Sequence, residues 1–203
     1  MLDTLISWDT DLFRLINNAR SPFADCVFAI ISSKVFIAVM VVVFTAAVMK
    51  KNQWKSWWLY ILMVGLCFLL ADRISVMCFK DTVCRLRPSH ALEDVTTVRF
   101  LHWKLIYGYK GGLYGIVSSH AANIFAVITA CFGCSGGFKQ KKNLKMLLLM
   151  LIWGLAAGYS RVYCGYHYPG DVICGALLGV IIGYFVAMFI NYLAKRLEKK
   201  RIQ

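Results

Sequence analysis

Five long runs of residues without charged side chains constrain the fold more than any other feature of the sequence. They are Val35 to Met49, with a mostly apolar stretch before it from Cys26, Trp57 to Ala71, Ala121 to Gly136, Met146 to Tyr159, and Val172 to Ile190. Each is at or near the roughly 20 residues that a helix needs to cross a bilayer. Because lipid offers the backbone no hydrogen-bond partners, such runs fold as helices. We predict an all-α fold, a polytopic transmembrane bundle of five to six membrane helices.

The N-terminal segment, residues 1–20, predicts an amphipathic helix that is associated with the membrane. Its apolar side chains fall mostly on one broad helical face, Asp3 and Asp11 lie outside that face, and Asp9 intrudes on it. A signal peptide is not expected, because three acids interrupt the apolar residues and a basic leading segment is missing. The sequence leaves open whether this helix spans the membrane or lies on it.

The basic residues indicate the topology. The net charge is +13, and much of it gathers after the first run, after the third run and in a basic tail, residues 195–203. These residues are Lys50, Lys51, Lys55, Lys139, Lys141, Lys142, Lys145, Lys195, Arg196, Lys199, Lys200 and Arg201. With five spans all three segments lie on one side, which the positive-inside rule makes cytoplasmic. No nucleic-acid-binding module is present, so nucleic acid is not an expected partner.

Ionisable and hydroxyl side chains border the spans on the opposite side. They come from three separate regions of the chain and are Lys80, Arg87, Ser118, Ser119, His120, Arg161, His167 and Asp171. Three strong cations imply an anion, and guanidinium groups suit phosphate oxygens. Any one of these residues could be an ordinary snorkelling anchor. Their convergence on one face instead predicts a functional site.

The long segment between the second and third runs, residues 81–116, predicts a loop or lid on this outer face. Connections of this length inside a compact protein are usually functional or disordered. Its aromatic residues favour an interfacial lid. They are Phe100, Trp103, Tyr107, Tyr109 and Tyr114.

The spacing of the site residues permits phosphoryl transfer. Pro169 is a natural first-turn residue, so the fifth helix is expected to begin there, with Asp171 in its first turn and within reach of His167. A carboxylate on one ring nitrogen leaves the other free to attack phosphorus. His120, near the start of a helix that a preceding serine caps, can protonate the leaving oxygen. We predict no metal and no cofactor, because a single well-placed carboxylate suits magnesium poorly.

Three sequence elements carry a resemblance to a known family. They are "KDTVCRLRP" from Lys80, "VSSH" ending at His120, and "SRVYCGYHYPGD" from Ser160 to Asp171. Together, and in this order, they resemble the motifs of the type 2 phosphatidic acid phosphatase superfamily, membrane lipid phosphatases related to vanadium haloperoxidases. The resemblance implies that phosphate is bound by Lys80, Arg87, Arg161, Ser118 and the amides around Ser119, with His167 as nucleophile, Asp171 as its orienting partner and His120 as general acid.

The second element departs from the family pattern. Val117 and Ser119 replace the usual proline and glycine, and the hydroxyl of Ser119 could add a phosphate contact. The resemblance further implies a phosphorylated membrane lipid as substrate, with undecaprenyl diphosphate or lipid A favoured. It also implies a bacterial inner membrane location with the active site facing the periplasm.

Alternatives remain at this point. A phosphohistidine intermediate also serves a lipid phosphotransferase, and intramembrane Arg, His and Asp also occur in transporters. A catalytically silent anion-binding protein is a third possibility. The cysteines allow a disulfide among Cys78, Cys84 and Cys164, whereas the Cys131 and Cys134 pair favours plain packing. The sequence predicts no particular oligomeric state.

Overall fold

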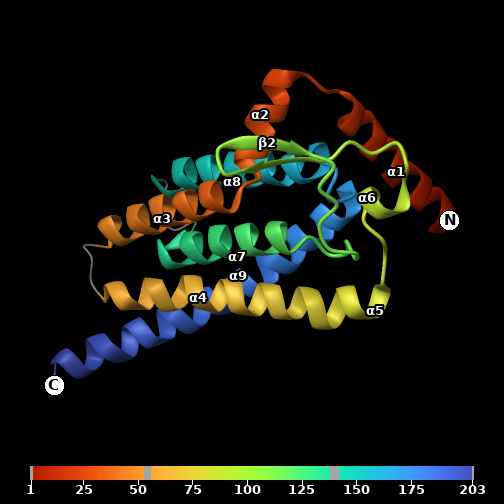
Figure 1. Cartoon of the computed structure of the whole chain (residues 1–203). Coiled ribbons are helices and arrows are strands. Elements are labelled where there is room, and N and C mark those ends of the chain that lie inside the picture. Colours follow the sequence, from red (N-terminus) through yellow and green to blue (C-terminus); the bar gives the residue numbers. More distant parts are fainter. Residues whose placement is uncertain (1, 53–55, 138–141, 203) are drawn as a thin grey trace.

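A computed structural model describes residues 2–52, 56–137 and 142–202, and these residues form a mostly helical bundle (Figure 1). The helices are α1 (Leu2–Asn18), α2 (Pro22–Ile31), α3 (Lys34–Lys51), α4 (Trp57–Ile74), η1, a π-helical continuation of α4 (Ser75–Lys80), α5 (Asp81–Val83), α6 (Pro88–Ala91), α7 (Ser119–Cys134), α8 (Lys142–Tyr163) and α9 (Pro169–Ile202). Strands β1 (Val98–Leu101) and β2 (Lys104–Tyr107) form a small antiparallel hairpin. The predicted helical membrane bundle is confirmed. The hairpin was not predicted from the sequence.

The five apolar runs lie in helices, except that Ser135 and Gly136 of the third run follow the end of α7. The helices differ in whether they are long enough to cross a membrane. Trp57–Val83, Asn143–Tyr163 and Pro169–Lys199 are each long and apolar enough to span, whereas α7 is a shorter apolar helix. Helices α2 and α3 qualify as a pair that bends by 55° at the break between them. The break follows from two serines, because Ser32 ends α2 and the Ser33 hydroxyl caps α3 by accepting from the Phe36 amide. The apolar stretch from Cys26 therefore does not continue straight into the first run.

A seam of small residues joins α7 to α9. Gly175, Gly179 and Gly183 recur every fourth residue along one face of α9, where a Cβ atom would lie 2.5, 2.3 and 2.3 Å from backbone carbonyl oxygens of α7. Since real Cβ atoms do not approach that closely, larger residues would force the two helices apart. The seam lets the two backbones touch, as small-residue interfaces do in membrane bundles. It places the first turns of α7 and α9 side by side.

The cysteines lie within this framework as single thiols. Cys131 and Cys134 are buried in the core that α3, α4, α7, α8 and α9 share. The Cys131 sulfur lies 3.9 Å from the Thr45 hydroxyl oxygen. All eight cysteines are free, so the structure contains no disulfide among Cys78, Cys84 and Cys164. Packing is the role that the structure supports for the Cys131 and Cys134 pair.

The two ends of the bundle differ in charge. Figure 1 shows the C-terminal ends of α3, α7 and α9 at one end and the first turns of α7 and α9 at the other. At the first end the Lys51 ammonium donates to the Ser135 carbonyl at 2.9 Å and to the Asn143 side chain. The described basic residues that the sequence analysis grouped thus share one end of the bundle, whereas Lys55, Lys139 and Lys141 lie outside the described residues.

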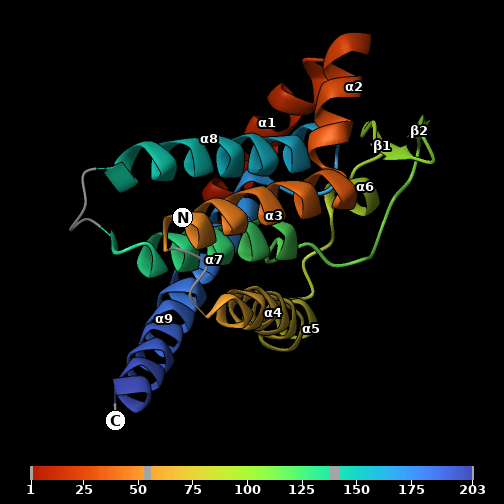
Figure 2. The ribbon, with the colours of Figure 1, turned by 90° about the vertical axis from the view of Figure 1, so that its left-hand side faces the viewer.

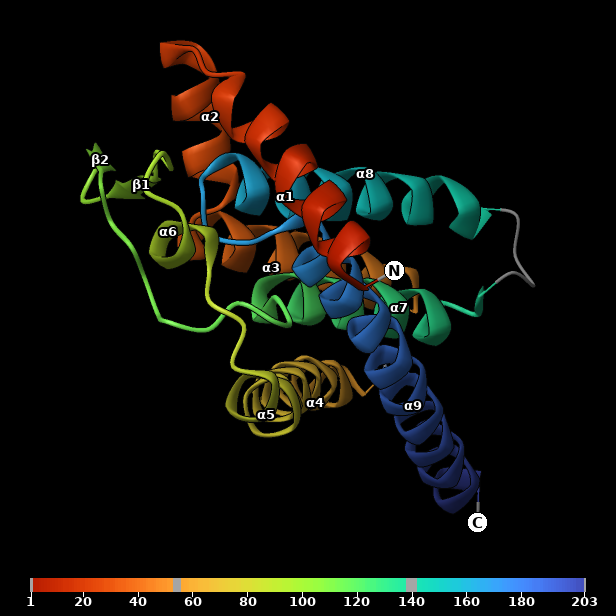
Figure 3. The ribbon, with the colours of Figure 1, turned by 90° about the vertical axis from the view of Figure 1, so that its right-hand side faces the viewer.

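Helix α1 packs beside the start of α9 and the end of α8, and Figures 1 and 3 agree on this position. Its outward face carries large apolar side chains, Leu5, Ile6, Trp8, Leu12 and Leu15. In Figure 2, α3, α7 and α8 lie side by side while α9 crosses obliquely. An apolar outer surface on α1 is what an element in contact with lipid requires.

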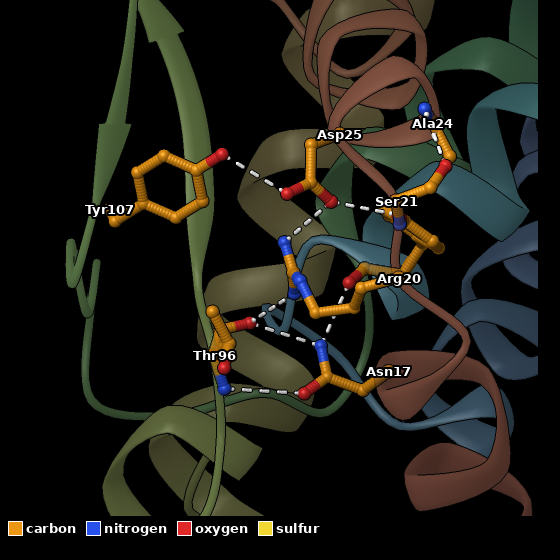
Figure 4. A network of polar contacts seen from close by, with 8 residues as sticks. Asn17, Arg20, Ser21, Ala24, Asp25, Thr96 and Tyr107 are labelled. Atoms are coloured by element: carbon orange, nitrogen blue, oxygen red, sulfur yellow. Dashed lines mark hydrogen bonds and ion pairs between the residues drawn. The ribbon is translucent and has the colours of Figure 1, made fainter.

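A polar network ties α1 and α2 to the hairpin (Figure 4). The Asn17 amide and the Arg20 guanidinium both donate to the Thr96 carbonyl, at 3.0 and 2.9 Å. Asp25 accepts from Arg20 at 2.9 Å and from the Tyr107 hydroxyl at 3.1 Å. Asp25 is buried, so this pairing also satisfies a carboxylate that would be costly alone. The network attaches the hairpin and the residue Thr96 before it to α1 and α2.

Candidate active site

The residues predicted to form a site lie at one end of the bundle. Lys80 ends the π-helical segment η1, Arg87 directly precedes α6, Ser118, Ser119 and His120 open α7, Arg161 is in the last turn of α8, His167 is in the turn between α8 and α9, and Asp171 is in the first turn of α9. Contacts join the three sequence regions directly. The Ser118 amide donates to the Asp171 carbonyl at 2.9 Å, and the Lys80 ammonium donates to the Ser119 hydroxyl at 2.7 Å.

Both helix starts at the site have the predicted local structure. Pro169 is the first residue of α9, and Asp171 follows in its first turn. Ser118, rather than Ser119, is the N-cap of α7, and its hydroxyl accepts from the Ala121 amide at 3.5 Å. The seam between α7 and α9 puts these two helix starts beside each other. Helix N-termini favour anions, because their first amides lack intrahelical partners.

His167 and Asp171 form a buried pair. The Nδ1 atom of His167 lies 3.5 Å from Oδ2 of Asp171, which also accepts from the Tyr168 amide at 3.1 Å. That separation is longer than an ordinary hydrogen bond, and within the described residues Nδ1 has no other partner. Burial, together with the charges of Arg161 and Arg87, lowers the pKa of His167 well below its usual value. The imidazole is therefore neutral near neutral pH, as its predicted role of nucleophile requires.

Arg161 is held at the end of α8 by the break between α2 and α3. Its Nη1 atom donates to the Ser32 hydroxyl at 2.5 Å, and its guanidinium carbon lies 4.4 Å from the centre of the Tyr166 ring. Its Nε atom is buried and has no hydrogen-bond partner in the described part of the chain. Ser32 was missed by sequence reasoning, although two adjacent serines in an apolar stretch were a visible signal. This guanidinium retains a donor for an anion.

A glycine-containing loop wraps around Arg87. The Arg87 Nε atom donates to the Tyr114 carbonyl at 3.0 Å. A Cβ at Gly111, whose φ is +73°, would lie 2.9 Å from Nη1 of Arg87, and a Cβ at Gly115 would lie 2.7 Å from Oδ2 of Asp171. Glycine lets the backbone approach both side chains closely. The loop thus packs the guanidinium and the carboxylate from one side.

Ser119 has a contact that the sequence did not predict. Its hydroxyl accepts from Lys80 at 2.7 Å, at the position where the family pattern usually has glycine. The residue is buried at the first position of α7. The hydroxyl of Ser119 therefore positions the ammonium of Lys80.

A cavity of about 730 Å³ opens beside these residues, and its wall includes Arg87, His120 and Arg161. Its other walls come from the junction of α2 and α3 and from the hairpin. His102 and Trp103, at the tip of the hairpin, are exposed and line it. The hairpin lies within the segment predicted as a lid, so that segment borders the cavity. In the described residues, no group of three or more His, Cys, Asp or Glu side chains is arranged to hold a metal ion.

One further arginine contacts the site and was missed. Arg85 donates to Oδ1 of Asp171 at 2.9 Å and to Oδ2 of Asp9 at 2.7 Å. The signals were present, since Arg85 lies in the first sequence element and Asp9 interrupts the apolar face of α1. Neither spacing nor charge could show that the two residues meet.

The model of the PAP2 superfamily matches residues 58–195, more than half of the chain, and that range includes every predicted site residue. The chain belongs to the PAP2 superfamily. The resemblance inferred from the three sequence elements is thereby confirmed.

Curated relatives of this PAP2 protein match along nearly its whole length. It is 28% identical over 200 residues to the lipid A 4'-phosphatase of Bacteroides thetaiotaomicron, a match that covers 98% of this chain and 84% of that protein. It is 30% identical over 197 residues to the lipid A 4'-phosphatase of Porphyromonas gingivalis, covering 96% and 78%. With the family, these relatives support the prediction of an enzyme: the chain is a lipid phosphatase, a hydrolase of the membrane.

Solved structures agree with the fold. The crystal structure of Aquifex aeolicus LpxE superposes with a TM-score of 0.55 at 27% identity, covering 87% of this chain and 93% of that one. A PAP2 type phosphatidylglycerolphosphate phosphatase from Bacillus subtilis superposes with a TM-score of 0.69 at 20% identity, covering 93% and 87%. At that identity the second likeness concerns the fold alone.

Proposed function

We propose that this PAP2 phosphatase removes a phosphate group from a lipid of the lipid A type, through a phosphohistidine at His167. The observation that carries the proposal is the cavity that opens on Arg87, His120 and Arg161. The near full-length similarity to two lipid A 4'-phosphatases supports the choice of lipid. Undecaprenyl diphosphate, the other lipid that the sequence favoured, is compared directly in the experiment below.

The first chemical step forms a bond between His167 and phosphorus. Lys80, Arg87 and Arg161 hold the phosphate oxygens, and the first amides of α7 face the same anion. The Nε2 lone pair of His167 attacks phosphorus in line with the bond to the sugar oxygen. As that bond breaks, His120 gives its proton to the departing oxygen, so the dephosphorylated lipid leaves as an alcohol.

The second step restores the enzyme. Water attacks phosphorus, His120 takes the proton from the water, and the bond between Nε2 and phosphorus breaks to release inorganic phosphate. Asp171, on the Nδ1 side of His167 at 3.5 Å, orients the ring and stabilises its positive charge during both steps. A lipid hydroxyl in place of water would give the phosphotransferase, so the acceptor separates these two activities.

The size and lining of the cavity suit a lipid headgroup. Its volume, about 730 Å³, lies in the range of roughly 300–1,000 Å³ typical of small-molecule sites. Arg99 and Tyr109 stack with 4.3 Å between the guanidinium carbon and the ring centre, and both line the cavity. The rest of the lining is mostly apolar and aromatic, and a few charged side chains in such walls suit the headgroup of a lipid. Substrate selection is therefore assigned to the hairpin side of the cavity.

The proposed location is a bacterial inner membrane, with the site at the periplasmic face. The supporting argument is electrostatic, because the basic ends of α3 and α9 lie at the end of the bundle opposite the site (Figure 1) and favour the cytoplasmic side. This orientation is tested by introducing single cysteines into the hairpin and labelling them in intact cells with a thiol reagent. Labelling only after the cells are broken would contradict it.

The test of the function is hydrolysis by the purified protein in detergent. Bisphosphorylated lipid A, undecaprenyl diphosphate and phosphatidic acid are offered separately, and released phosphate and lipid products are measured, the latter by mass spectrometry. We expect lipid A to lose one phosphate fastest. His167→Ala and His120→Ala are expected to abolish release, while a chelator leaves it unchanged. Faster hydrolysis of undecaprenyl diphosphate would overturn the assignment of lipid A.

The intermediate is tested with lipid A that carries ³²P on the phosphate that is removed. Acid quench is avoided, because a phosphoramidate is labile in acid and survives alkali. We expect alkali-stable label on the wild type, little on His120→Ala, because that variant lacks the acid for the leaving oxygen, and none on His167→Ala. Label that persists on His167→Ala would contradict the role of this histidine as nucleophile.

A further inference from the structure

Arg85 forms ion pairs with two carboxylates, and one of them is Asp171 of the predicted catalytic pair. Arg85 donates through Nη1 to Asp171 at 2.9 Å and through Nη2 to Asp9 at 2.7 Å. The side chain of Asp171 is 0% exposed, that of Asp9 15% and that of Arg85 23%. A buried carboxylate needs a charge partner, and at Asp171 the guanidinium provides it. The Arg85 guanidinium also lies 4.0 Å from the centre of the Tyr168 ring, which fixes its plane.

Asp9 contacts both Arg85 and the start of α9. While Oδ2 of Asp9 accepts from Arg85, its Oδ1 accepts from the Gly170 amide at 2.7 Å. Gly170 is the second residue of α9, so the carboxylate of α1 occupies the N-terminus of the helix that carries Asp171. A Cβ at Gly170 would lie 3.0 Å from an Asp9 oxygen. Helix α1 is therefore attached at the base of the predicted catalytic pair.

The two oxygens of Asp171 are thereby divided between two tasks. Oδ1 accepts from Arg85, and Oδ2 accepts from the Tyr168 amide and faces Nδ1 of His167. The arginine thus fixes the rotation of the carboxylate that orients the nucleophile. Arg87, two residues further on, borders the cavity, whereas Arg85 is absent from the cavity-lining residues of the described ranges. The two arginines of one sequence element thus differ in their contacts, because Arg85 binds Asp171 and Arg87 borders the cavity.

The placement of Asp9 explains the irregular face of α1. Asp9, Phe13 and Asn17 recur at intervals of four residues, and Phe13 and Asn17 are almost fully buried. This stripe faces the bundle, while the exposed apolar side chains of α1, such as Trp8 and Leu15, point outward. An acid in the inward stripe is costly unless it is paired, and Arg85 together with the Gly170 amide pairs it.

We propose that Arg85 and Asp9 are positioning residues of the phosphatase, with Arg85 fixing the carboxylate of Asp171 and Asp9 holding Arg85 and the start of α9. Helix α1 thereby belongs to the active-site scaffold in addition to the membrane-bound surface. The proposal rests on the proposed function, since it assigns Asp171 as the partner of the nucleophile. It concerns turnover, because Arg85 and Asp9 act through the carboxylate of Asp171 and not through the proposed phosphate-binding cations.

The test uses Asp9→Asn, Arg85→Lys and Arg85→Gln in the purified full chain, with Asp3→Asn as the matched control on the exposed face of α1. The lipid is the one that the wild type hydrolyses fastest. We expect Asp9→Asn to lower kcat about tenfold and Arg85→Gln about 100-fold, with KM within twofold of the wild type. Arg85→Lys is expected to recover part of the loss, and Asp3→Asn to match the wild type.

The double variant Asp9→Asn with Arg85→Gln separates the two roles. The side-chain oxygen of Asn can still accept from the Gly170 amide, so if Asp9→Asn acts by loosening Arg85, the double variant has the kcat of Arg85→Gln alone. Inorganic phosphate should still raise the melting temperature of each variant, because Lys80, Arg87 and Arg161 are intact. Should Asp9→Asn melt below the assay temperature, Arg85→Lys and Arg85→Gln carry the test alone.

Several outcomes overturn the proposal. An unchanged kcat in Asp9→Asn or Arg85→Gln would do so, as would a raised KM at constant kcat, and additive losses in the double variant would remove the link from Asp9 to Arg85. Failure of the proposed function looks different. In that case the wild type prefers another lipid, or His167→Ala keeps activity, and the kcat ratios of the variants are still measured on the preferred lipid.

Discussion

The seam between α7 and α9 and the hairpin β1–β2 border the same site but are held in opposite ways. In the seam, three glycines bring two backbones into contact, and a Cβ would collide with carbonyl oxygens at 2.3 to 2.5 Å. The hairpin and the residue before it are held by polar bonds of Asp25 and Thr96 (Figure 4), and the tip of the hairpin is exposed. The seam therefore positions the helix starts that carry the predicted catalytic residues, whereas the hairpin borders the cavity where substrate selection is proposed.

Breaking the seam is expected to have the largest effect. Gly179→Leu would drive a side chain into the carbonyl oxygen of Ala122, and overpacking of this kind costs about 3 kcal/mol. We expect little monodisperse protein in detergent and a strongly lowered melting temperature. Gly65→Leu is the matched control, because a Cβ at Gly65 meets nothing within 4 Å. Equal behaviour of the two variants would show that the seam does not hold the fold.

A substitution that disturbs the site but leaves the seam intact is expected to have the next largest effect. Gly115→Ala places a Cβ 2.7 Å from an Asp171 oxygen, so the carboxylate must move away from His167. We expect kcat/KM to fall about 100-fold with a nearly unchanged melting temperature. Gly112→Ala serves as control, because its nearest contacts, atoms of Arg87, lie at 3.8 and 3.9 Å. An equal loss of kcat/KM in Gly112→Ala would show that the whole loop, and not the contact with Asp171, is sensitive to substitution.

The buried histidine predicts a pH dependence of stability. Because burial lowers the pKa of His167 in the folded protein, the unfolded chain binds this proton first as the pH falls below about 6.5. Stability therefore declines below that pH, by at most about 1.4 kcal/mol per pH unit for one proton. His167→Gln should flatten this slope in thermal unfolding, whereas His102→Gln, at the exposed hairpin, should leave it. An unchanged slope in His167→Gln would contradict the prediction.

Loosening the hairpin is expected to have the smallest effect. Tyr107→Phe removes one hydrogen bond to Asp25, worth about 1 kcal/mol. We expect KM for the lipid to rise up to about fivefold, with kcat unchanged. Tyr184→Phe, on an exposed face of α9, is the control. A change in kcat instead of KM would mean that the hairpin takes part in the chemistry.

Local patterns predicted much of the site. Pro169 begins α9, Ser118 caps α7, and the residues of the three sequence elements meet at one end of the bundle. These features depend on neighbours in the sequence or on the side of the membrane at which a span ends, so spacing and hydropathy carry them. The assigned roles of His167 and His120 remain predictions for the experiments above.

Other features depend on residues far apart in the chain, and spacing could not reveal them. Ser32 meets Arg161 only because the first apolar stretch bends at two serines. Ser119 was expected to face phosphate, and its hydroxyl accepts from Lys80 because the π-helical segment brings that ammonium to the start of α7. The hairpin lacks a clear alternating pattern and is stabilised by contacts with α2.

The sequence by itself determined that this protein is a membrane helix bundle with charged side chains from three regions at one end, because uncharged runs need lipid and charges beside them are costly unless paired. Tertiary structure alone decided how that site is supported. Asp9 appeared in the sequence as a flaw in an amphipathic face, and it became a partner of Arg85 once α1 packed against α9. The physical reason is that the cost of burying a charge depends on its partner, and that partner is brought close only by folding.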